Sequence, residues 1–244
     1  MPPTFEIVYE DADLLVINKP ADLVCHPTKG DVYSSLVSRV RLYLGDGLES
    51  HLINRLDRET TGLVLVAKNL ASARAWRQIW ERREVTKIYL AVVHGTMSQD
   101  RGIIDAPLGK DLRSPVAIKD CVLEGGSPAV TEFEVEERWS SDLGDFTRLR
   151  VLPRSGRKHQ IRIHLSHLGH PIVGDKLYGR DEQIYLAFVE KRMTEAQRVQ
   201  LLLANHALHA LELRARCLER DWQFRADPSP EFLTFASPPA AGVR

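Results

Sequence analysis

Short apolar runs bounded by charged or turn-forming residues recur along the chain, and each predicts a β-strand. Residues 5–9 and 14–18 flank an acidic stretch, 10–13, which predicts a hairpin with an acidic turn. Phe133 and Val135 alternate with glutamates over residues 131–137, the pattern of a half-exposed strand. Further strands are predicted over residues 63–67, 87–93, 146–152 and 207–213.

Apolar residues spaced three and four apart predict helices between these strands. Trp76 and Trp80 fall on the apolar stripe of one such helix, so they are expected in the core rather than in a ligand site. The first predicted helix is residues 36–44, after Ser34 or Ser35 and before a loop with Gly45 and Gly47, and the second is capped by Asn69. A third contains Ile161, Leu165 and Leu168 and ends at Gly169. A fourth runs from the capping box of Thr194 and Gln197 to about Ala204.

Strands joined by hairpins and interspersed with helices indicate an α+β fold with a mixed, largely antiparallel sheet flanked by helices and loops. No break in composition marks a second domain, so residues 1–225 are predicted to form one domain. The Pro-rich tail, 226–244, is expected to be frayed. Residues 107–128 are rich in Gly, Pro and charge and are expected to form a long surface connection.

The composition is that of an ordinary globular protein, with 43% apolar and 27% charged residues and a net charge of zero. Zero net charge argues against a protein that coats nucleic acid non-specifically. Cys25, Cys121 and Cys217 form no Cys-x-x-Cys pair, which argues against a disulfide framework. A signal peptide and an 18-residue apolar run are both missing, so we expect a cytoplasmic protein that does not span a membrane, and nothing requires more than a monomer.

One carboxylate, Asp57, lies between Arg55 and Arg58 and just ahead of an apolar strand. The two guanidinium groups favour its ionised form and are expected to lower its pKa, so Asp57 can act as a nucleophile or a base at neutral pH. The alternative is that Asp57 is a turn residue or part of a surface ion pair.

A second candidate segment, residues 146–174, contains no Asp or Glu. It predicts a local cationic surface, although its first two arginines could simply form the solvent face of a strand. A metal site is not predicted, because no His-Glu-x-x-His motif or matching acidic ligand accompanies the histidines. Nucleotide-binding glycine motifs are also absent, so a bound nucleotide cofactor is not expected. The basic residues are Arg148, Arg150, Arg154, Arg157, Lys158 and Arg162, with His159, His164, His167 and His170.

Three segments, residues 54–62, 87–95 and 155–164, together resemble the RluA family of pseudouridine synthases. Residues 15–20 and 169–179 extend the likeness. The resemblance implies the pseudouridine synthase fold and an enzyme that isomerises uridine in structured ribosomal or transfer RNA, without a cofactor or metal. It makes Asp57 the catalytic aspartate, Tyr89 the residue that packs on the uracil, Arg162 the basic partner of the aspartate, and Ile161 a residue lining the pocket. Candidate RNA contacts are Arg55, Arg58, Arg154, Arg157 and His159.

Two departures from the family pattern affect this interpretation. Asn54 replaces the usual histidine, so any contact of that histidine is in question. No S4 RNA-binding domain precedes the catalytic segment, so RNA selection is expected from residues 107–130 or 181–204, unless the latter only cover the core. A hydrolase would normally need a second carboxylate about 5 to 9 Å from the first. A non-catalytic RNA-binding protein that retains the fold is the other alternative.

Overall fold

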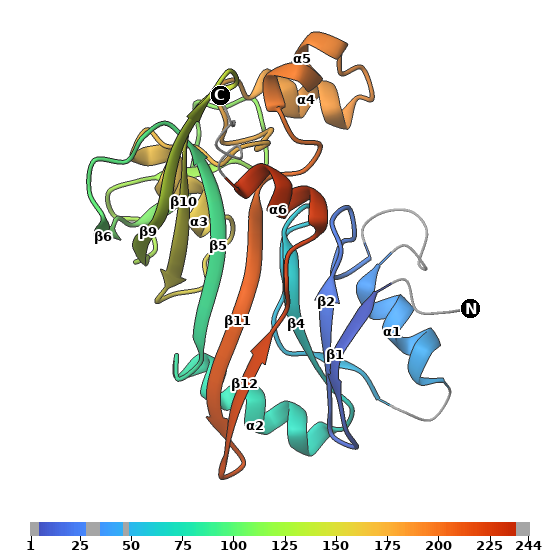
Figure 1. Cartoon of the computed structure of the whole chain (residues 1–244). Coiled ribbons are helices and arrows are strands. Elements are labelled where there is room, and N and C mark those ends of the chain that lie inside the picture. The colour runs from blue at the N-terminus through green and yellow to red at the C-terminus, as the bar shows by residue number, and fades with distance from the viewer. Residues whose placement is uncertain (1–4, 28–34, 46–48, 238–244) are drawn as a thin grey trace, which may run out of the picture. The chain divides into compact units, whose positions relative to one another are not determined.

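The computed structural model describes residues 5–27, 35–45 and 49–237, which fall into two compact units (Figure 1). The first unit comprises residues 1–88 and 209–228, and the second comprises residues 89–208 and 229–244. Ser34 and Gly47, for which a cap and a loop were predicted, lie outside the described residues. In the described part of the chain no helix is long and apolar enough to cross a membrane.

The first unit contains a mixed sheet in the order β1, β2, β4, β11, with β12 pairing with β11 and β3 with β4. All these pairs are antiparallel except β4 with β11, so the prediction of a mixed, largely antiparallel sheet is confirmed here. The predicted hairpin of residues 5–18 is present as β1 and β2. The strands are β1 (Glu6–Glu10), β2 (Leu14–Lys19), β3 (His51–Leu52), β4 (Thr61–Ala67), β11 (Leu208–Cys217) and β12 (Arg220–Arg225).

In the described part of the first unit, both helices begin at predicted caps. Ser35 caps α1 (Leu36–Leu44), and Asn69 caps α2 (Leu70–Glu81) by accepting a hydrogen bond from the backbone of Ser72 at 2.8 Å. Trp76 is 2% exposed and packs in one cluster with apolar residues of β2, β4 and β11. This position confirms that Trp76 belongs to the core.

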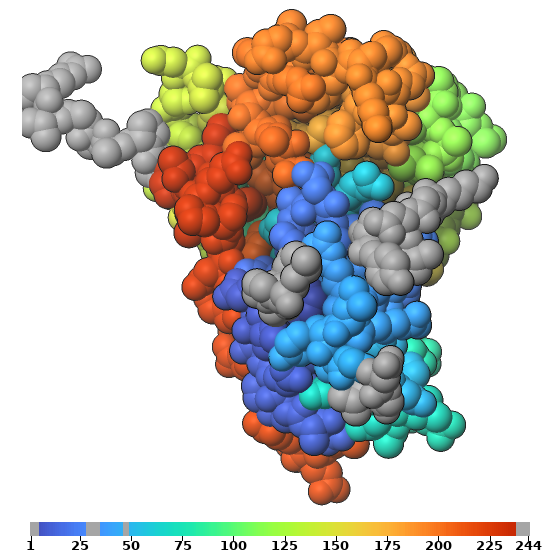
Figure 2. Space-filling model, turned by 90° about the vertical axis from the view of Figure 1, so that its right-hand side faces the viewer, coloured from blue at the N-terminus to red at the C-terminus, as the bar shows by residue number. Residues whose placement is uncertain are grey.

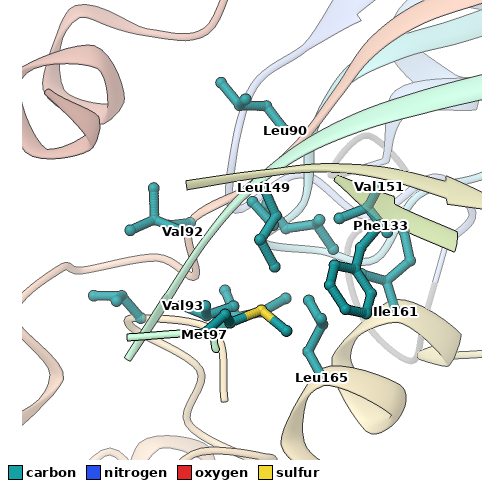
Figure 3. Packing of buried hydrophobic residues seen from close by; sticks show 14 of the residues in the cluster. Leu90, Val92, Val93, Met97, Phe133, Leu149, Val151, Ile161 and Leu165 are labelled. Carbon is teal, nitrogen blue, oxygen red and sulfur yellow. The ribbon is translucent and has the colours of Figure 1, made fainter. Parts of the chain in front are cut away.

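The second unit contains an antiparallel sheet in the order β5, β10, β9, β6. Its core joins β5, β9 and β10 to α3, as Figure 3 shows for Leu149, Val151, Phe133 and Ile161. Leu168, which was predicted to lie in the same helix as Ile161 and Leu165, follows the last residue of α3 and is 41% exposed. The elements are β5 (Thr86–His94), β6 (Arg101–Asp105), β9 (Val130–Ser141), β10 (Gly144–Pro153), α3 (Gln160–His167), α4 (Gln183–Val189) and α5 (Glu195–Leu201).

Two stretches are more ordered than their composition suggested. Within the predicted surface connection, β7 (Leu108–Lys110) pairs with β8 (Asp120–Val122). The tail contains α6 (Pro230–Ala236), which Ser229 caps. Phe232 of α6 is 8% exposed within the core of the second unit, so the expectation of a frayed tail is wrong over this helix. Burial of apolar side chains outweighs the local proline content there.

Candidate active site

The loop carrying Asp57 is attached to the sheet of the first unit by Asn54. The Asn54 amide donates to the Leu63 carbonyl at 3.1 Å, and its oxygen accepts from the Leu65 amide at 2.8 Å. Both partners are backbone groups of β4, so the side chain extends the hydrogen bonding of the sheet by one residue. Asn54 therefore has a structural function in this chain, which the sequence comparison with the family pattern left in question.

Two buried side chains hold the backbone on either side of Asp57. The Cys25 thiol accepts from the Leu56 amide at 3.3 Å and donates to the Leu56 carbonyl at 3.4 Å. The Lys19 ammonium donates to the Arg58 carbonyl at 3.0 Å and to two carbonyls of its own loop, at 2.8 and 2.9 Å. Asp57 itself is half-buried, whereas Arg55 and Arg58 are exposed.

Lys19 is fully buried, with 0% of its surface exposed. Burial lowers its pKa to about 8, although the neighbouring Cys25 and Asp57 groups favour the protonated form. A cation close to Asp57 stabilises a carboxylate there. The expected low pKa of Asp57 itself stays a prediction.

Gly62 closes the Asp57 motif at the point where β4 pairs with β11. A Cβ atom at Gly62 would lie 2.3 Å from the Ala210 carbonyl oxygen, and its φ of +108° also requires glycine. Beside it, His209 is 1% exposed and bridges the Thr61 hydroxyl at 2.7 Å and the Ala226 carbonyl at 2.8 Å. Since the carbonyl can only accept, Nε2 carries the proton and Nδ1 accepts from Thr61. Burial lowers the pKa of His209 to about 4, so it stays neutral.

Tyr89 and Ile161 share one hydrophobic cluster in the second unit. Tyr89 lies on β5 opposite Val151 of β10 and packs against the cluster as a half-buried ring. Ile161 is 6% exposed within the same cluster (Figure 3). An apolar wall with one aromatic ring is suited to holding a detached planar base away from water. Their contacts with a substrate stay predictions.

Arg162 forms a buried bidentate ion pair with Asp175. Its Nε atom lies 2.6 Å from Oδ2 and its Nη2 atom 2.9 Å from Oδ1 of Asp175. Oδ1 also accepts from the amides of Leu177 and Tyr178, each at 2.9 Å. Burial opposes the charge of Asp175, but the Arg162 guanidinium and the hydrogen bonds outweigh burial and hold its pKa well below the usual range. The orientation of Arg162 is therefore fixed, while its predicted contact with Asp57 stays a prediction.

Tyr178 packs beside this pair. The Arg162 guanidinium carbon lies 5.0 Å from the centre of its ring, within the range of a cation–π contact. The Tyr178 hydroxyl lies 2.8 Å from Nδ1 of His159, which adopts a left-handed backbone with φ of 56° directly before α3. Burial raises the pKa of Tyr178, so its hydroxyl keeps its proton. The loop that precedes Arg162 is thereby fixed through His159.

The basic residues of segment 146–174 are largely matched by carboxylates from elsewhere in the second unit, which corrects the prediction of a cationic surface. Their partners come from β9, β8 and the stretch after α3, segments that the sequence pattern did not connect with them. For Arg148 and Arg150 this supports the alternative of a solvent-facing strand. The pairs are Arg148 with Glu136 and Glu137, Arg150 with Glu136, Arg154 with Glu132, Lys158 with Asp120, and Arg162 with Asp175.

The histidines of this segment support the fold. His164 is fully buried and bridges the Thr131 hydroxyl at 2.8 Å and the Ala106 carbonyl at 2.9 Å. His170 bonds the His94 carbonyl at 2.9 Å. Across the residues that the structure describes, no group of three or more His, Cys, Asp or Glu side chains is arranged to hold a metal ion.

Sequence reasoning did not identify the supporting roles of Lys19, Cys25, Asp175 and Tyr178. For Lys19 and Asp175 the sequence offered an indication, because each follows an apolar run. A charged residue that is buried with such a run must be paired, since burial of an unpaired charge is costly. Cys25 and Tyr178 carried none, because their partners are a backbone group and a distant side chain. Lys19 and Cys25 fix the loop that carries the Asp57 carboxylate in the first unit. Asp175 and Tyr178 fix the Arg162 guanidinium, which belongs to the second unit together with the apolar wall.

Comparisons with known proteins bear on this chemistry. A family model described as RNA pseudouridylate synthase matches residues 13–167, which is more than half of the chain. The uncharacterized RNA pseudouridine synthase YlyB of Bacillus subtilis is 38% identical over 184 residues, 73% of this chain and 59% of that protein. Ribosomal large subunit pseudouridine synthase D of Haemophilus ducreyi is 35% identical over 211 residues, 85% of this chain and 62% of that protein. The chain thus spans about three fifths of the length of these curated relatives.

The fold is shared with solved structures. Human RNA Pseudouridylate Synthase Domain Containing 1 matches with a TM-score of 0.73 and 28% identity, over 93% of this chain and 84% of that chain. Human RNA Pseudouridylate Synthase Domain Containing 4 matches with a TM-score of 0.70 and 26% identity, over 93% and 90% of the two chains. The predicted α+β fold is confirmed.

Proposed function

Because the chain belongs to the RluA family of RNA pseudouridylate synthases, we propose that it isomerises uridine to pseudouridine in structured RNA, with Asp57 as the catalytic carboxylate. The bond between ribose C1′ and ring N1 breaks, and a bond between C1′ and C5 of the same base forms. N1 gains a proton and C5 loses one, so the reaction needs no oxidant or further substrate.

The observation that carries this proposal is the fixation of the loop around Asp57. Lys19, Cys25 and Asn54 hold the backbone before and after the carboxylate, so Asp57 can meet the substrate without reorganising. Asp57 attacks the ribose or the uracil ring, or removes a sugar proton to start elimination. Tyr89 packs on the uracil, and Arg162 keeps Asp57 ionised and oriented.

RNA contacts are proposed for Arg55 and Arg58, which are exposed on either side of Asp57. Arg154, Arg157 and His159 remain candidates, although each has a partner within the protein. Extrusion of the target base costs a few kcal/mol, which such contacts must offset. The printed names of several relatives refer to the ribosomal large subunit, so we propose ribosomal RNA as the first substrate to test, with transfer RNA as the alternative. We further propose that the protein acts as a monomer in the cytoplasm.

The test is release of tritium from RNA labelled at C5 of uridine, using total RNA from a strain that lacks the gene. Wild type is expected to release tritium, and Asp57→Asn to release none while binding RNA within a few fold of wild type, since shape and charge dominate affinity. Asp142→Asn, in an exposed turn, is the matched control. Equal release by Asp57→Asn would remove Asp57 from the mechanism, and RNA binding without release by wild type would favour the non-catalytic alternative.

A further inference from the structure

Residues 107–130, here called the protrusion, form a part of the second unit that is held in place by packing and hydrogen bonds. Within it β7 pairs with β8, and two glycines allow the strands and the returning chain to approach closely. A Cβ atom at Gly109 would lie 2.6 Å from a methyl group of Leu123, and one at Gly126 would lie 2.5 Å from the Leu108 carbonyl oxygen. The protrusion is therefore a compact structure and not a free loop.

The protrusion is also attached firmly at its base. Lys158 donates to the Ile118 carbonyl at 2.8 Å and pairs with Asp120 at 2.7 Å. The Tyr178 hydroxyl accepts from the Asp120 amide at 3.2 Å. Val116 is 2% exposed and belongs to a cluster with Ile163 of α3 and with Tyr178. Tyr178, which packs beside Arg162, thus also supports the protrusion.

A carboxylate of the 181–204 segment connects that segment to the protrusion. Glu182 accepts from the Ser114 hydroxyl at 2.7 Å and from the Lys119 ammonium at 2.6 Å. Those two hydrogen bonds lower the pKa of Glu182, so the connection persists at neutral pH. Figure 2 shows the green residues of the protrusion beside the orange residues of the 181–204 segment. Glu182 therefore joins the two regions that are expected to select RNA.

The tip of the protrusion, residues 111–114, exposes two side chains and turns its carboxylate inward. The Asp111 side chain is 12% exposed, accepts from the Arg113 amide at 3.1 Å and lies 3.9 Å from Nε of Arg113. By contrast Leu112 is 88% exposed, the highest value among the large apolar residues that the structure describes, and the Arg113 side chain is 92% exposed. A fixed turn therefore presents one aliphatic side chain beside one cation.

We propose that the 111–114 tip contacts the substrate RNA, with Leu112 packed against an unstacked base and Arg113 bound to the adjoining phosphate. Apolar side chains that enter a base stack and guanidinium groups that bind phosphate are recurring RNA and DNA contacts. A single leucine offers far less area than a protein interface requires. Because the backbone of the protrusion is already held by hydrogen bonds and packing, binding costs it little conformational entropy. The inference rests on the proposed function only in taking RNA as the substrate.

The experiment measures kcat, KM and RNA binding for Leu112→Ala and Arg113→Ala at several salt concentrations. Leu143→Ala and Arg101→Ala are matched controls, because both residues are also exposed in the second unit and lie outside the two regions expected to select RNA. Leu112→Ala is expected to weaken kcat/KM about tenfold, mainly through KM, and Leu112→Met to restore most of the loss. Arg113→Ala is expected to reduce the slope of the logarithm of the RNA binding constant against the logarithm of salt concentration by about 1, which corresponds to one phosphate contact. Arg113→Lys is expected to preserve that slope.

Either control losing as much as the tip variants would overturn the assignment to the tip. Tip variants within twofold of wild type, with an unchanged salt dependence, would overturn the inference and favour a protein partner. If wild type binds RNA without isomerising uridine, and the tip variants still weaken that binding, the proposed function fails while this inference stands.

Discussion

Replacing Asp175 should destabilise the second unit far more than breaking any exposed ion pair of similar geometry. The Asp175 side chain is 0% exposed and that of Arg162 is 8% exposed. In Asp175→Asn the amide nitrogen would face the Nε–H of Arg162, so two donors would meet and the guanidinium would lose the negative charge of Asp175. Removing one partner of a buried pair costs about 3 to 5 kcal/mol, because it leaves an uncompensated charge.

Glu132→Gln provides the matched comparison. Arg154 binds Glu132 in the same bidentate manner, with both distances at 2.7 Å, but the arginine side chain is 53% exposed. An exposed pair contributes under about 1 kcal/mol. The free energy of unfolding, measured in urea by circular dichroism, should therefore fall by about 3 to 5 kcal/mol for Asp175→Asn and by under about 1 kcal/mol for Glu132→Gln. The melting temperature should fall by roughly 6 to 20 °C in the first case.

The dependence of the free energy of unfolding on pH in acid provides an independent check. Since the pKa of Asp175 is lower in the folded than in the unfolded state, its contribution is complete above the unfolded pKa, about 4, and is lost as pH falls toward the folded value. Wild type should lose stability more steeply than Asp175→Asn below about pH 4. Equal stability of Asp175→Asn and Glu132→Gln at pH 7, or parallel acid curves, would refute the reasoning.

Three further outcomes are expected. Gly62→Ala should destabilise the protein by more than about 1 kcal/mol and slow tritium release, because the methyl group would displace β11 from β4; unchanged melting and turnover would contradict this. Between about pH 8 and 10.5 Lys19 keeps its proton in the unfolded chain but releases it in the folded protein. Over that range the free energy of unfolding of wild type, measured in urea titrations, should therefore rise by about 3 kcal/mol relative to that of Lys19→Met. Parallel dependence of the two proteins on pH would argue against this reasoning. Leu218→Asn should raise the melting temperature by a few degrees, since φ of 52° suits Asn better than Leu; a lower melting temperature would be inconsistent with a strained turn.

Local sequence patterns predicted the elements well where local interactions determine them. Asn69 and the pair Thr194 and Gln197 cap helices as expected, because capping depends on residues three positions apart. The boundary was less accurate where packing decides it, and α5 ends at Leu201 rather than near Ala204. The helix in the tail was missed, because burial of Phe232 depends on residues of the core that are distant in sequence.

The sequence motifs propose the residues of the candidate site but do not indicate the contacts that hold these residues in place. Asp57, Tyr89 and Arg162 follow from ordered motifs, whereas the partner of Arg162 lies 13 residues further along, past the end of α3. Charge pairing across strands also escaped the linear pattern, because Glu132 and Arg154 meet only when β9 and β10 pair. A stretch that looks strongly basic in sequence is thus nearly neutral in the folded unit.

The pairing of β4 with β11 has a consequence for how the protein is made. The first unit is built from residues 1–88 and 209–228, and His209 connects Thr61 to Ala226. During synthesis the chain emerges from its N-terminus, so this unit cannot complete its sheet until about 140 further residues have been translated. The sheet beside the Asp57 loop is incomplete until β11 has been made, and a ribosome that stalls before residue 209 releases a chain whose first unit is unfinished. Pairing over so long a separation also favours slow folding, and therefore a period of dependence on chaperones.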